Sequence, residues 1–268
     1  MHQPLVSVTI CTYNGELFLR QLLDSLVKLN YSNIEFIFVD DGSTDSTLEI
    51  LKEFADKYSS VYIFTQHNQG LASARNHAFA RAKGTWICVI DQDDIIYPDR
   101  ISDQLRVASD YPSASLIFGN THHIDHSGNI IGEHLSGFDL PCPPIPSLLS
   151  MEKLLLHGCF IDSEAWFFKK SLYQSAGPLN VNLRYSCDFE YFLRLSKLTD
   201  LAFTTLYVGA WRQHPGQSSA QYPRIRSEWR RVVGPYLFDN EICMPVRLKL
   251  FIKLLKSSIF SVFLLFRR

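Results

Sequence analysis

Three aspartates, Asp91, Asp93 and Asp94, stand within four residues of one another. Carboxylates this close repel one another unless a cation lies among them. Hard oxygen ligands suit Mg²⁺ or Mn²⁺, which keep several waters and commonly bridge substrate phosphates. An ion held there could neutralise the charge that develops on a diphosphate leaving group. The alternative is a solvated acidic turn that caps a helix over residues 98–110.

A second pair of carboxylates, Asp40 and Asp41, precedes a glycine that allows a tight turn and a serine that can cap a helix. A turn and a cap explain one aspartate better than two. A carboxylate at the end of a strand can also accept hydrogen bonds from a nucleotide base or a ribose hydroxyl. We therefore interpret Asp41 as a contact to a nucleotide.

The first apolar run of the chain ends in Thr12, Tyr13, Asn14 and Gly15. Asn-Gly favours a turn by itself, so a plain strand-to-helix connection is one interpretation. The other is that Thr12, Tyr13 and Asn14 contact a base or a ribose, since ligands of open α/β sheets bind at the carboxyl ends of the strands.

Each of these motifs follows an apolar run that is typical of a buried strand. Such runs cover residues 5–11, 34–39, 61–64, 85–90 and 116–118, and helical patterns lie between them over residues 16–29, 43–54 and 72–82. This alternation predicts an α/β fold, with a mostly parallel central sheet and helices on both faces. The carboxyl edge of that sheet would bring the motifs together.

Four motifs agree in order and spacing with a known family: VSVTICTYNG (6–15), VDDGSTD (39–45), NQGLASARN (68–76) and GTWICVIDQDD (84–94), followed by PDR (98–100). Over about residues 5–120 the chain resembles the nucleotide-binding part of family 2 glycosyltransferases. The resemblance implies a GT-A fold, a nucleotide-sugar donor and a divalent metal, Mn²⁺ or Mg²⁺.

The resemblance also implies roles for single residues. Asp41 looks like the residue that contacts the base, and Asp91 and Asp93 look like the D-x-D pair, with Asp93 nearest the metal. Asn76 could equally be a residue of a helix surface. The remaining contacts to the donor are expected from Thr12, Tyr13, Asn14, Arg75, Asn76 and Gln92.

The catalytic base of this family is usually an acid in a Glu-Asp pair, at the start of a helix in the second half. Asp188 in SCDFEYFLR (186–194) looks like this base, although Cys187 replaces the preceding acid. Glu190 is the second candidate for the base. A helix cap is an alternative role for Asp188, and it is compatible with catalysis.

The segment WRQHPGQSS (211–219) resembles a loop that often follows in the family. Arg212 or His214 could meet the diphosphate or the metal there, and we name His214 with Asp93 as the metal ligands. A lone histidine is more often structural. The chain has no Gln-x-x-Arg-Trp motif, which counts against a processive polysaccharide synthase.

Six of the 26 basic residues, and no acidic residue, fall within residues 245–268, which leaves 20 basic against 27 acidic residues elsewhere. Apolar residues recur there at helical spacing, but the longest uncharged run is too short to span a bilayer. We expect a basic amphipathic helix over residues 241–268 that lies on an anionic membrane. Packing on the body of the enzyme, or against a second copy, is the alternative.

The 268 residues are 46% hydrophobic and have a formal net charge of −1, so we expect no nucleic-acid partner. We expect one GT-A domain in two halves, residues 1–120 for the nucleotide sugar and residues 121–240 for the acceptor. The six cysteines form no C-x-x-C pair, which argues against a cysteine zinc cluster and fits a reducing compartment. No secretory signal is recognisable, so a cytoplasmic location is expected, with attachment to the inner face of the membrane left open.

The expected reaction is an inverting, metal-dependent transfer from a nucleotide-diphosphate sugar to a hydroxyl of a glycan or a lipid-linked acceptor, in surface polysaccharide synthesis. One alternative is a sugar nucleotidyltransferase, which usually has a Gly-rich, basic loop after the first strand where this chain has Thr-Tyr-Asn-Gly-Glu. A non-catalytic module that binds nucleotide sugars is the other.

Overall fold

The computed structural model describes the backbone of residues 3–265 and the side chains of residues 3–257. One sheet runs through the molecule in the order β3-β2-β1-β4-β8-β6-β9-β5, and β7 pairs with β6. The strands are β1 (Val6–Thr12), β2 (Ile34–Asp40), β3 (Val61–Thr65), β4 (Trp86–Asp91), β5 (Ile95–Ile96), β6 (Ala114–Ile124), β7 (Ile130–Glu133), β8 (Phe167–Lys169) and β9 (Asp200–Arg212).

The first four strands are parallel, as the alternation of strands and helices predicts. Beyond β4 the sheet is mixed, because β8 runs antiparallel to both β4 and β6, whereas β6 and β9 are parallel. The carboxyl ends of β1, β2 and β4 therefore meet at one edge, where the aspartate motifs begin. The predicted α/β class with a mostly parallel central sheet is confirmed.

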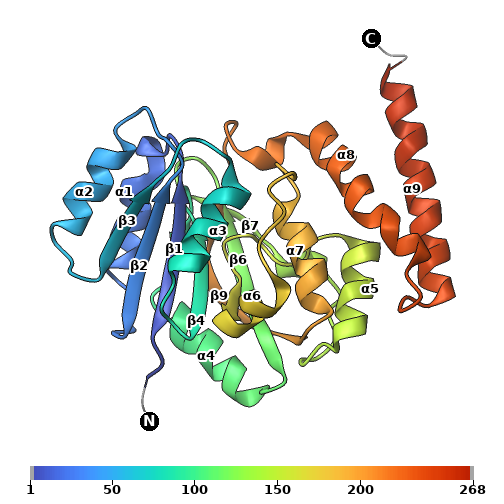
Figure 1. Cartoon of the computed structure of the whole chain (residues 1–268), viewed down its shortest axis with the longest axis horizontal. Coiled ribbons are helices and arrows are strands. Elements are labelled where there is room, and N and C mark those ends of the chain that lie inside the picture. Colours follow the sequence, from blue (N-terminus) through green and yellow to red (C-terminus); the bar gives the residue numbers. More distant parts are fainter. Residues whose placement is uncertain (1–2, 266–268) are drawn as a thin grey trace.

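Helices cover both faces of the sheet (Figure 1). They are α1 (Glu16–Leu26), α2 (Thr47–Ala55), α3 (Leu71–Arg81), α4 (Arg100–Asp110), α5 (Ser147–His157), α6 (Lys170–Ala176), α7 (Cys187–Ser196), α8 (Tyr222–Val233) and α9 (Met244–Leu265). Helices α1, α2 and α4 pack on one face, and α3, α5, α6 and α7 pack on the other.

Alternation along β2 shows how the sequence fills both faces. Phe36 and Phe38 belong to the core under α1 and α2, whereas Ile37 and Val39 belong to the core under α3 and α7. Side chains of a strand point alternately to opposite faces, so a strand buried on both sides has to be apolar at every position. The short apolar runs of the sequence are therefore the strands of the sheet centre.

Strand β6 is longer than the run at residues 116–118 predicts. It continues through the polar residues Asn120, Thr121, His122 and His123, because β9 pairs with it along this whole stretch. The division between the two halves at residue 120 stays a prediction, and residue 120 lies inside this strand.

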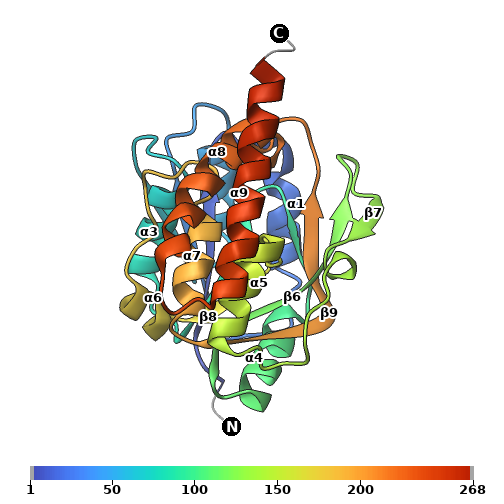
Figure 2. The same cartoon turned by 90° about the vertical axis from the view of Figure 1, so that its right-hand side faces the viewer.

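The expected C-terminal helix begins at Met244 and is α9. Its first half packs on the body, since Val246 and Leu250 are buried in the core beside α5 and α7. Beyond α8 the helix extends past the rest of the molecule (Figure 2). In the part of the chain that the structure describes, no helix has the length and apolar character needed to cross a membrane. The expected basic residues Arg267 and Arg268 lie outside the described residues.

Candidate active site

The first aspartate of the D-x-D motif is anchored by two other segments. Asp91, the last residue of β4, accepts a hydrogen bond from Nη2 of Arg75 at 2.7 Å through Oδ1. Its Oδ2 accepts one from the hydroxyl of Ser163 at 2.7 Å. Both carboxylate oxygens are therefore engaged by the chain itself, which fixes the direction in which the rest of the motif leaves the sheet.

Arg75 links this carboxylate to the second half of the chain. The guanidinium is only 1% exposed and lies over the ring of Trp166, 5.4 Å from the ring centroid. Burial works against its charge, but the negative charges of Asp91 and Asp188 raise the pKa of Arg75 above its ordinary value. Arg75 is thus a permanent cation paired with Asp91, and the charge of Asp188 acts on it as well; its contact to the donor stays a prediction.

The other aspartate of the motif meets a histidine from the far end of the chain. Oδ2 of Asp93 lies 2.8 Å from Nε2 of His214. The loop is held from behind by Arg212, whose Nε donates to the carbonyl of Asp93 at 2.8 Å and whose backbone N–H donates to Asp94 at 2.8 Å. Phe18 of α1 contacts both the imidazole of His214 and the guanidinium of Arg212.

This pair fits a divalent ion better than any other group of the D-x-D region. A carboxylate oxygen and an imidazole nitrogen converge, and both are ligands that Mn²⁺ accepts. Asp91 is bound by Arg75 and Ser163, and Asp94 is buried beneath the backbone of Arg212. The residues that could hold a metal at this edge are therefore Asp93 and His214, the two that the sequence predicts.

Asp41 organises the loop that leads into α3. Its carboxylate accepts hydrogen bonds from Nε2 of Gln66 at 2.8 Å and from the backbone N–H groups of Gln69 at 2.9 Å and Gly70 at 2.7 Å. A carboxylate offers about four acceptor positions. The predicted contact to a base would use the position that remains.

The turn after β1 is held by side chains of the turn after β2. The hydroxyl of Thr12 donates to Asp40 at 3.1 Å, and Oδ1 of Asn14 accepts from the backbone N–H of Thr44 at 2.9 Å. Asn14 has a positive φ of 47°, which asparagine tolerates better than most residues. Thr12 and Asn14 therefore fix the turn after β1 against the turn after β2, and their contacts to the donor stay predictions.

Tyr13 and Gln92 link the turn after β1 to the turn after β4. The N–H of Tyr13 donates to Oε1 of Gln92 at 2.9 Å, and Nε2 of Gln92 donates back to the carbonyl of Tyr13 at 3.1 Å. This pairing uses only the backbone of Tyr13, and the residue is 46% exposed. Of these two residues, Tyr13 has the ring that is open to a ligand.

Asn76 has a different place from the other predicted donor residues. Its side chain donates to the carbonyl of Leu179 at 3.0 Å and accepts from the N–H of Leu179 at 2.7 Å. This two-way pairing holds the segment that precedes α7 against α3. This pairing gives Asn76 a structural role that requires no contact with the donor. It also shows that Asn76 is more than a residue of a helix surface.

Asp188 is the second residue of α7 and is half-buried. Burial raises the pKa of Asp188 above its ordinary value, and the nearby charge of Arg75 opposes that shift. Glu190 points elsewhere, because Nε of Arg194 binds it at 2.7 Å. Of the two acids Asp188 and Glu190, Asp188 is therefore the one on which the charges of Arg75 and Asp91 act.

Three of the predicted carboxylates, Asp41, Asp91 and Asp188, act electrostatically on Cys11 and on the buried Arg75. The thiol of Cys11 lies within the electrostatic reach of Arg75, Asp91 and Asp41, and Asp188 lies within that of Arg75 and Asp91. Burial and these carboxylates raise the pKa of Cys11 despite Arg75, so the thiol stays protonated. These residues come from β1, the turn after β2, α3, β4 and the start of α7, and their charges act on one another near the carboxyl edge of the sheet.

Two buried glutamates of the site region carry no recognisable signal in the sequence. Glu228 of α8 accepts from three consecutive N–H groups, those of Arg184, Tyr185 and Ser186, and so fixes the start of α7. Glu164 is 1% exposed, and neither carboxylate oxygen has a hydrogen-bond partner among the described residues. Burial, with the charge of Asp162, raises the pKa of Glu164 well above its ordinary value, so it is held neutral.

Comparison with known proteins agrees with this geometry. The family model described as glycosyl transferase family 2 matches residues 7–175, which is more than half of the chain. The chain belongs to glycosyl transferase family 2. The resemblance noted from the four sequence motifs is thereby confirmed, and the match ends before Asp188 and His214.

Relatives of this family 2 domain agree in sequence and in fold. An uncharacterised glycosyltransferase of Rickettsia felis is 29% identical over 240 residues, which are 88% of this chain and 38% of that protein. The structure of Staphylococcus aureus TarS 1–349 in complex with UDP-GlcNAc has a TM-score of 0.74 at 18% identity, and the match covers 94% of this chain and 72% of the TarS 1–349 chain. The mannosyltransferase PcManGT of Pyrobaculum calidifontis, in complex with GDP-Man and Mn²⁺, has a TM-score of 0.68 at 17% identity, over 94% and 70% of the two chains.

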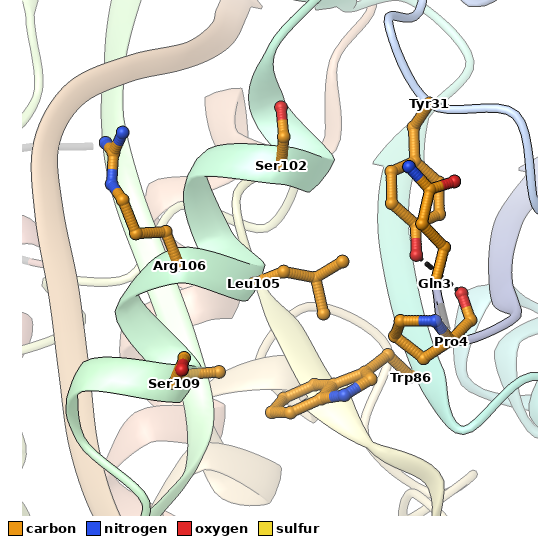
Figure 3. Close-up of a pocket in the computed structure, with 9 residues that line it drawn as sticks. Gln3, Pro4, Tyr31, Trp86, Ser102, Leu105, Arg106 and Ser109 are labelled. Carbon is orange, nitrogen blue, oxygen red and sulfur yellow. Dashed lines mark hydrogen bonds between the residues drawn. The ribbon is translucent and has the colours of Figure 1, made fainter. Parts of the chain in front are cut away.

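A hollow of about 500 Å³ elsewhere on the family 2 domain is not the active site (Figure 3). Its lining is mostly apolar and includes Pro4, Tyr31, Trp86 and Leu105. Pro4 precedes β1 and Trp86 begins β4, so the hollow lies at the amino ends of the strands. The aspartates lie at the opposite, carboxyl ends, where ligands of such sheets bind.

Proposed function

We propose that this domain transfers a sugar from a nucleotide-diphosphate sugar to a hydroxyl of a glycan or a lipid-linked acceptor, with inversion at the anomeric carbon. The observation that carries the proposal is the buried ion pair between Arg75 and Asp91 of the D-x-D motif, with the charge of Asp188 acting on the same guanidinium. This arrangement supports Asp188 as the basic group at that edge of the sheet. The nucleotide sugars in the TarS and PcManGT complexes support the class of donor.

In this reaction Asp188 accepts the proton of the acceptor hydroxyl. Burial raises its pKa, which makes it a stronger base than a solvated aspartate, and the charge of Arg75 opposes that shift and so favours the ionised form. The acceptor oxygen then attacks the anomeric carbon on the face opposite the nucleotide, which inverts the configuration there. A divalent ion held by Asp93 and His214, Mn²⁺ or Mg²⁺, would neutralise charge on the departing diphosphate.

The test of the base is a matched pair of variants in one turn of α7. Nucleotide release is measured for a panel of nucleotide sugars with Mn²⁺, and donor binding is measured separately by calorimetry. Asp188→Asn should lose turnover by about 10² or more, which is the usual contribution of a general base, and should keep donor affinity. Glu190→Gln should keep most of the turnover, because an amide oxygen can still accept from Arg194.

Wild-type turnover in Asp188→Asn would contradict the assignment of the base. Donor binding without turnover in the unmodified chain, for every donor and acceptor tried, would instead favour a binding module. For the metal, Asp93→Ala and His214→Ala should both weaken Mn²⁺-dependent nucleotide binding. Unchanged titrations would remove these two residues from the metal site.

We further propose that α9 attaches the domain to an anionic membrane, as expected for a lipid-linked acceptor in surface polysaccharide synthesis. The proposal rests on the face of α9 opposite Val246 and Leu250. That face exposes an apolar row with Lys249 and Lys256 beside it. The row consists of Leu248, Phe251, Ile252 and Leu255. The cytoplasmic location expected from the sequence stays a prediction.

Point variants test this better than truncation, because removing α9 would also remove Val246 and Leu250 from the core. Phe251→Glu with Leu255→Glu should reduce co-sedimentation with phosphatidylglycerol vesicles. Val181→Glu, at an exposed apolar position outside α9, is the matched control and should bind the vesicles as the unmodified chain does. Equal sedimentation of all three chains would rule out attachment through this row.

A further inference from the structure

Three side chains with metal-binding atoms meet outside the D-x-D region. His123 lies on β6, His134 follows β7, and Asp162 lies in the segment before β8. Nδ1 of His134 is 2.9 Å from Oδ1 of Asp162, and Nε2 of His123 is 3.9 Å from Oδ2 of Asp162. One ligand atom from each residue lies within 4.8 Å of the other two.

The surroundings hold all three groups in place. Thr121, which is fully buried, donates its hydroxyl to Oδ2 of Asp162, and its carbonyl accepts from the backbone N–H of His134 at 3.0 Å. The ring of Trp211 packs edge-on against His123, with the centroids 5.0 Å apart. Nε2 of His123 and Nε2 of His134 are buried and have no hydrogen-bond partner in the described part of the chain.

We propose that His123, His134 and Asp162 form a site for a divalent transition-metal ion, with Zn²⁺ as the preferred ion. Two imidazoles and one carboxylate suit Zn²⁺ and its neighbours in the first row, which bind imidazole more readily than Mg²⁺ does. With bonds of about 2.1 Å, two ligands of a tetrahedral Zn²⁺ lie about 3.4 Å apart. Each imidazole nitrogen lies near that separation from one oxygen of Asp162, His134 at 2.9 Å from Oδ1 and His123 at 3.9 Å from Oδ2.

The support of Asp162 by Thr121 resembles the outer contacts that orient metal ligands. Such partners fix the direction of a ligand, and their removal typically weakens metal binding by about 10- to 100-fold. Here the supporting residue is Thr121, which lies on β6 together with the ligand His123. One strand therefore supplies both a ligand and the support of another ligand.

This site is separate from Asp93 and His214 but connected to the same edge of the sheet. The residue after Asp162 is Ser163, which donates to Asp91. An ion bound by the three residues would fasten the β6–β7 hairpin to the segment that holds the D-x-D motif (Figure 2). We assign it a positioning role on the acceptor side, and no step of the transfer depends on it.

The experiment measures Zn²⁺ and Co²⁺ binding by the full chain after removal of metals with a chelator. The D-x-D region is first disabled in an Asp93→Asn, His214→Ala chain, which should still bind about one equivalent of Zn²⁺. Adding His123→Ala or His134→Ala should abolish that binding, and Thr121→Val should weaken it by about 10-fold or more. His122→Ala is the matched control, because His122 faces the other side of β6 toward Tyr97 and Tyr207.

The Co²⁺ spectrum of the chain with all three residues intact provides a test that does not depend on how the variants fold. Visible d–d bands of a four- or five-coordinate ion without a thiolate charge-transfer band are expected. A thiolate band would assign the ion to cysteines and overturn the proposal. Unchanged Zn²⁺ binding after His123→Ala, or loss of binding after His122→Ala alone, would also overturn it.

Discussion

Replacing Arg75 by methionine tests whether a single buried cation holds the site together. The substitution keeps much of the side-chain volume but removes the charge that lies 2.7 Å from Asp91 and that raises the ionised fraction of Asp188. Asp91 would keep only the hydroxyl of Ser163 as a partner. We expect a less stable protein and a catalytic base that is harder to ionise.

The magnitude follows from burial. Breaking a buried ion pair by removing one partner typically costs about 3–5 kcal/mol, because the other charge is left uncompensated. The side chain of Asp91 is 23% exposed and keeps one hydrogen bond, so the lower end of this range applies here, about 3 kcal/mol. The measurement is urea denaturation of both chains with linear extrapolation of the free energy of unfolding.

The control is Arg20→Met, which breaks the surface pair with Glu53, where both side chains are more than half exposed. Exposed ion pairs contribute about 0–1 kcal/mol to stability, so the free energy of unfolding of this variant should fall by less than about 1 kcal/mol. A loss below about 1 kcal/mol for Arg75→Met as well would refute the view of Arg75 as an essential buried counter-ion.

The pH dependence of kcat/KM gives a second measurement on the same variant. Asp188 acts as a base only when it is ionised, so activity falls as the pH drops through its pKa. Burial already raises this pKa above the roughly 3.9 of a solvated aspartate, and Arg75 opposes the shift. Arg75→Met should therefore move the acid limb to higher pH, and an unmoved limb would contradict the coupling.

Two further substitutions test the supports of the site. In Gly15→Ala the new Cβ would lie 2.3 Å from Oε1 of Gln92, so the flexible end of Gln92 has to leave its pairing with Tyr13, and the free energy of unfolding should fall by about 0.5–1.5 kcal/mol in urea titrations; a neutral result would show that this pairing does not stabilise the turn. Asn76→Ala leaves the N–H and the carbonyl of Leu179 without their partner, and a loss of about 1–3 kcal/mol in the same assay is expected, whereas an unchanged midpoint would show that this pairing is not needed.

The strands of the sheet centre could be predicted from the sequence because burial on both faces demands unbroken apolar runs. The run at residues 34–39 became β2, and the run at 85–90 became β4 with a shift of one residue at each end. The same criterion failed for β6, whose second half carries Asn120, Thr121 and two histidines. Pairing with β9 and β7 stabilises that half, and such pairing leaves no periodic signal.

The candidate site could be predicted where a residue type has a chemical meaning by itself. Asp93 and His214 were named as metal ligands, and the structure brings them to 2.8 Å across 121 positions of sequence. The partners that hold the site were not predicted. Ser163 and Glu228 come from segments with no motif, because any hydroxyl or carboxyl there looks like an ordinary polar residue until the chain is folded.

The continuity of the sheet limits how this domain can be recombined with its relatives. A chimera joined at residue 120 would cut β6 between the part that pairs with β8 and the part that carries His122 and His123. The first 120 residues therefore cannot be exchanged between relatives as an independent unit. A junction within residues 140–146, after the β6–β7 hairpin, would leave that strand whole and let the donor half keep its own β6.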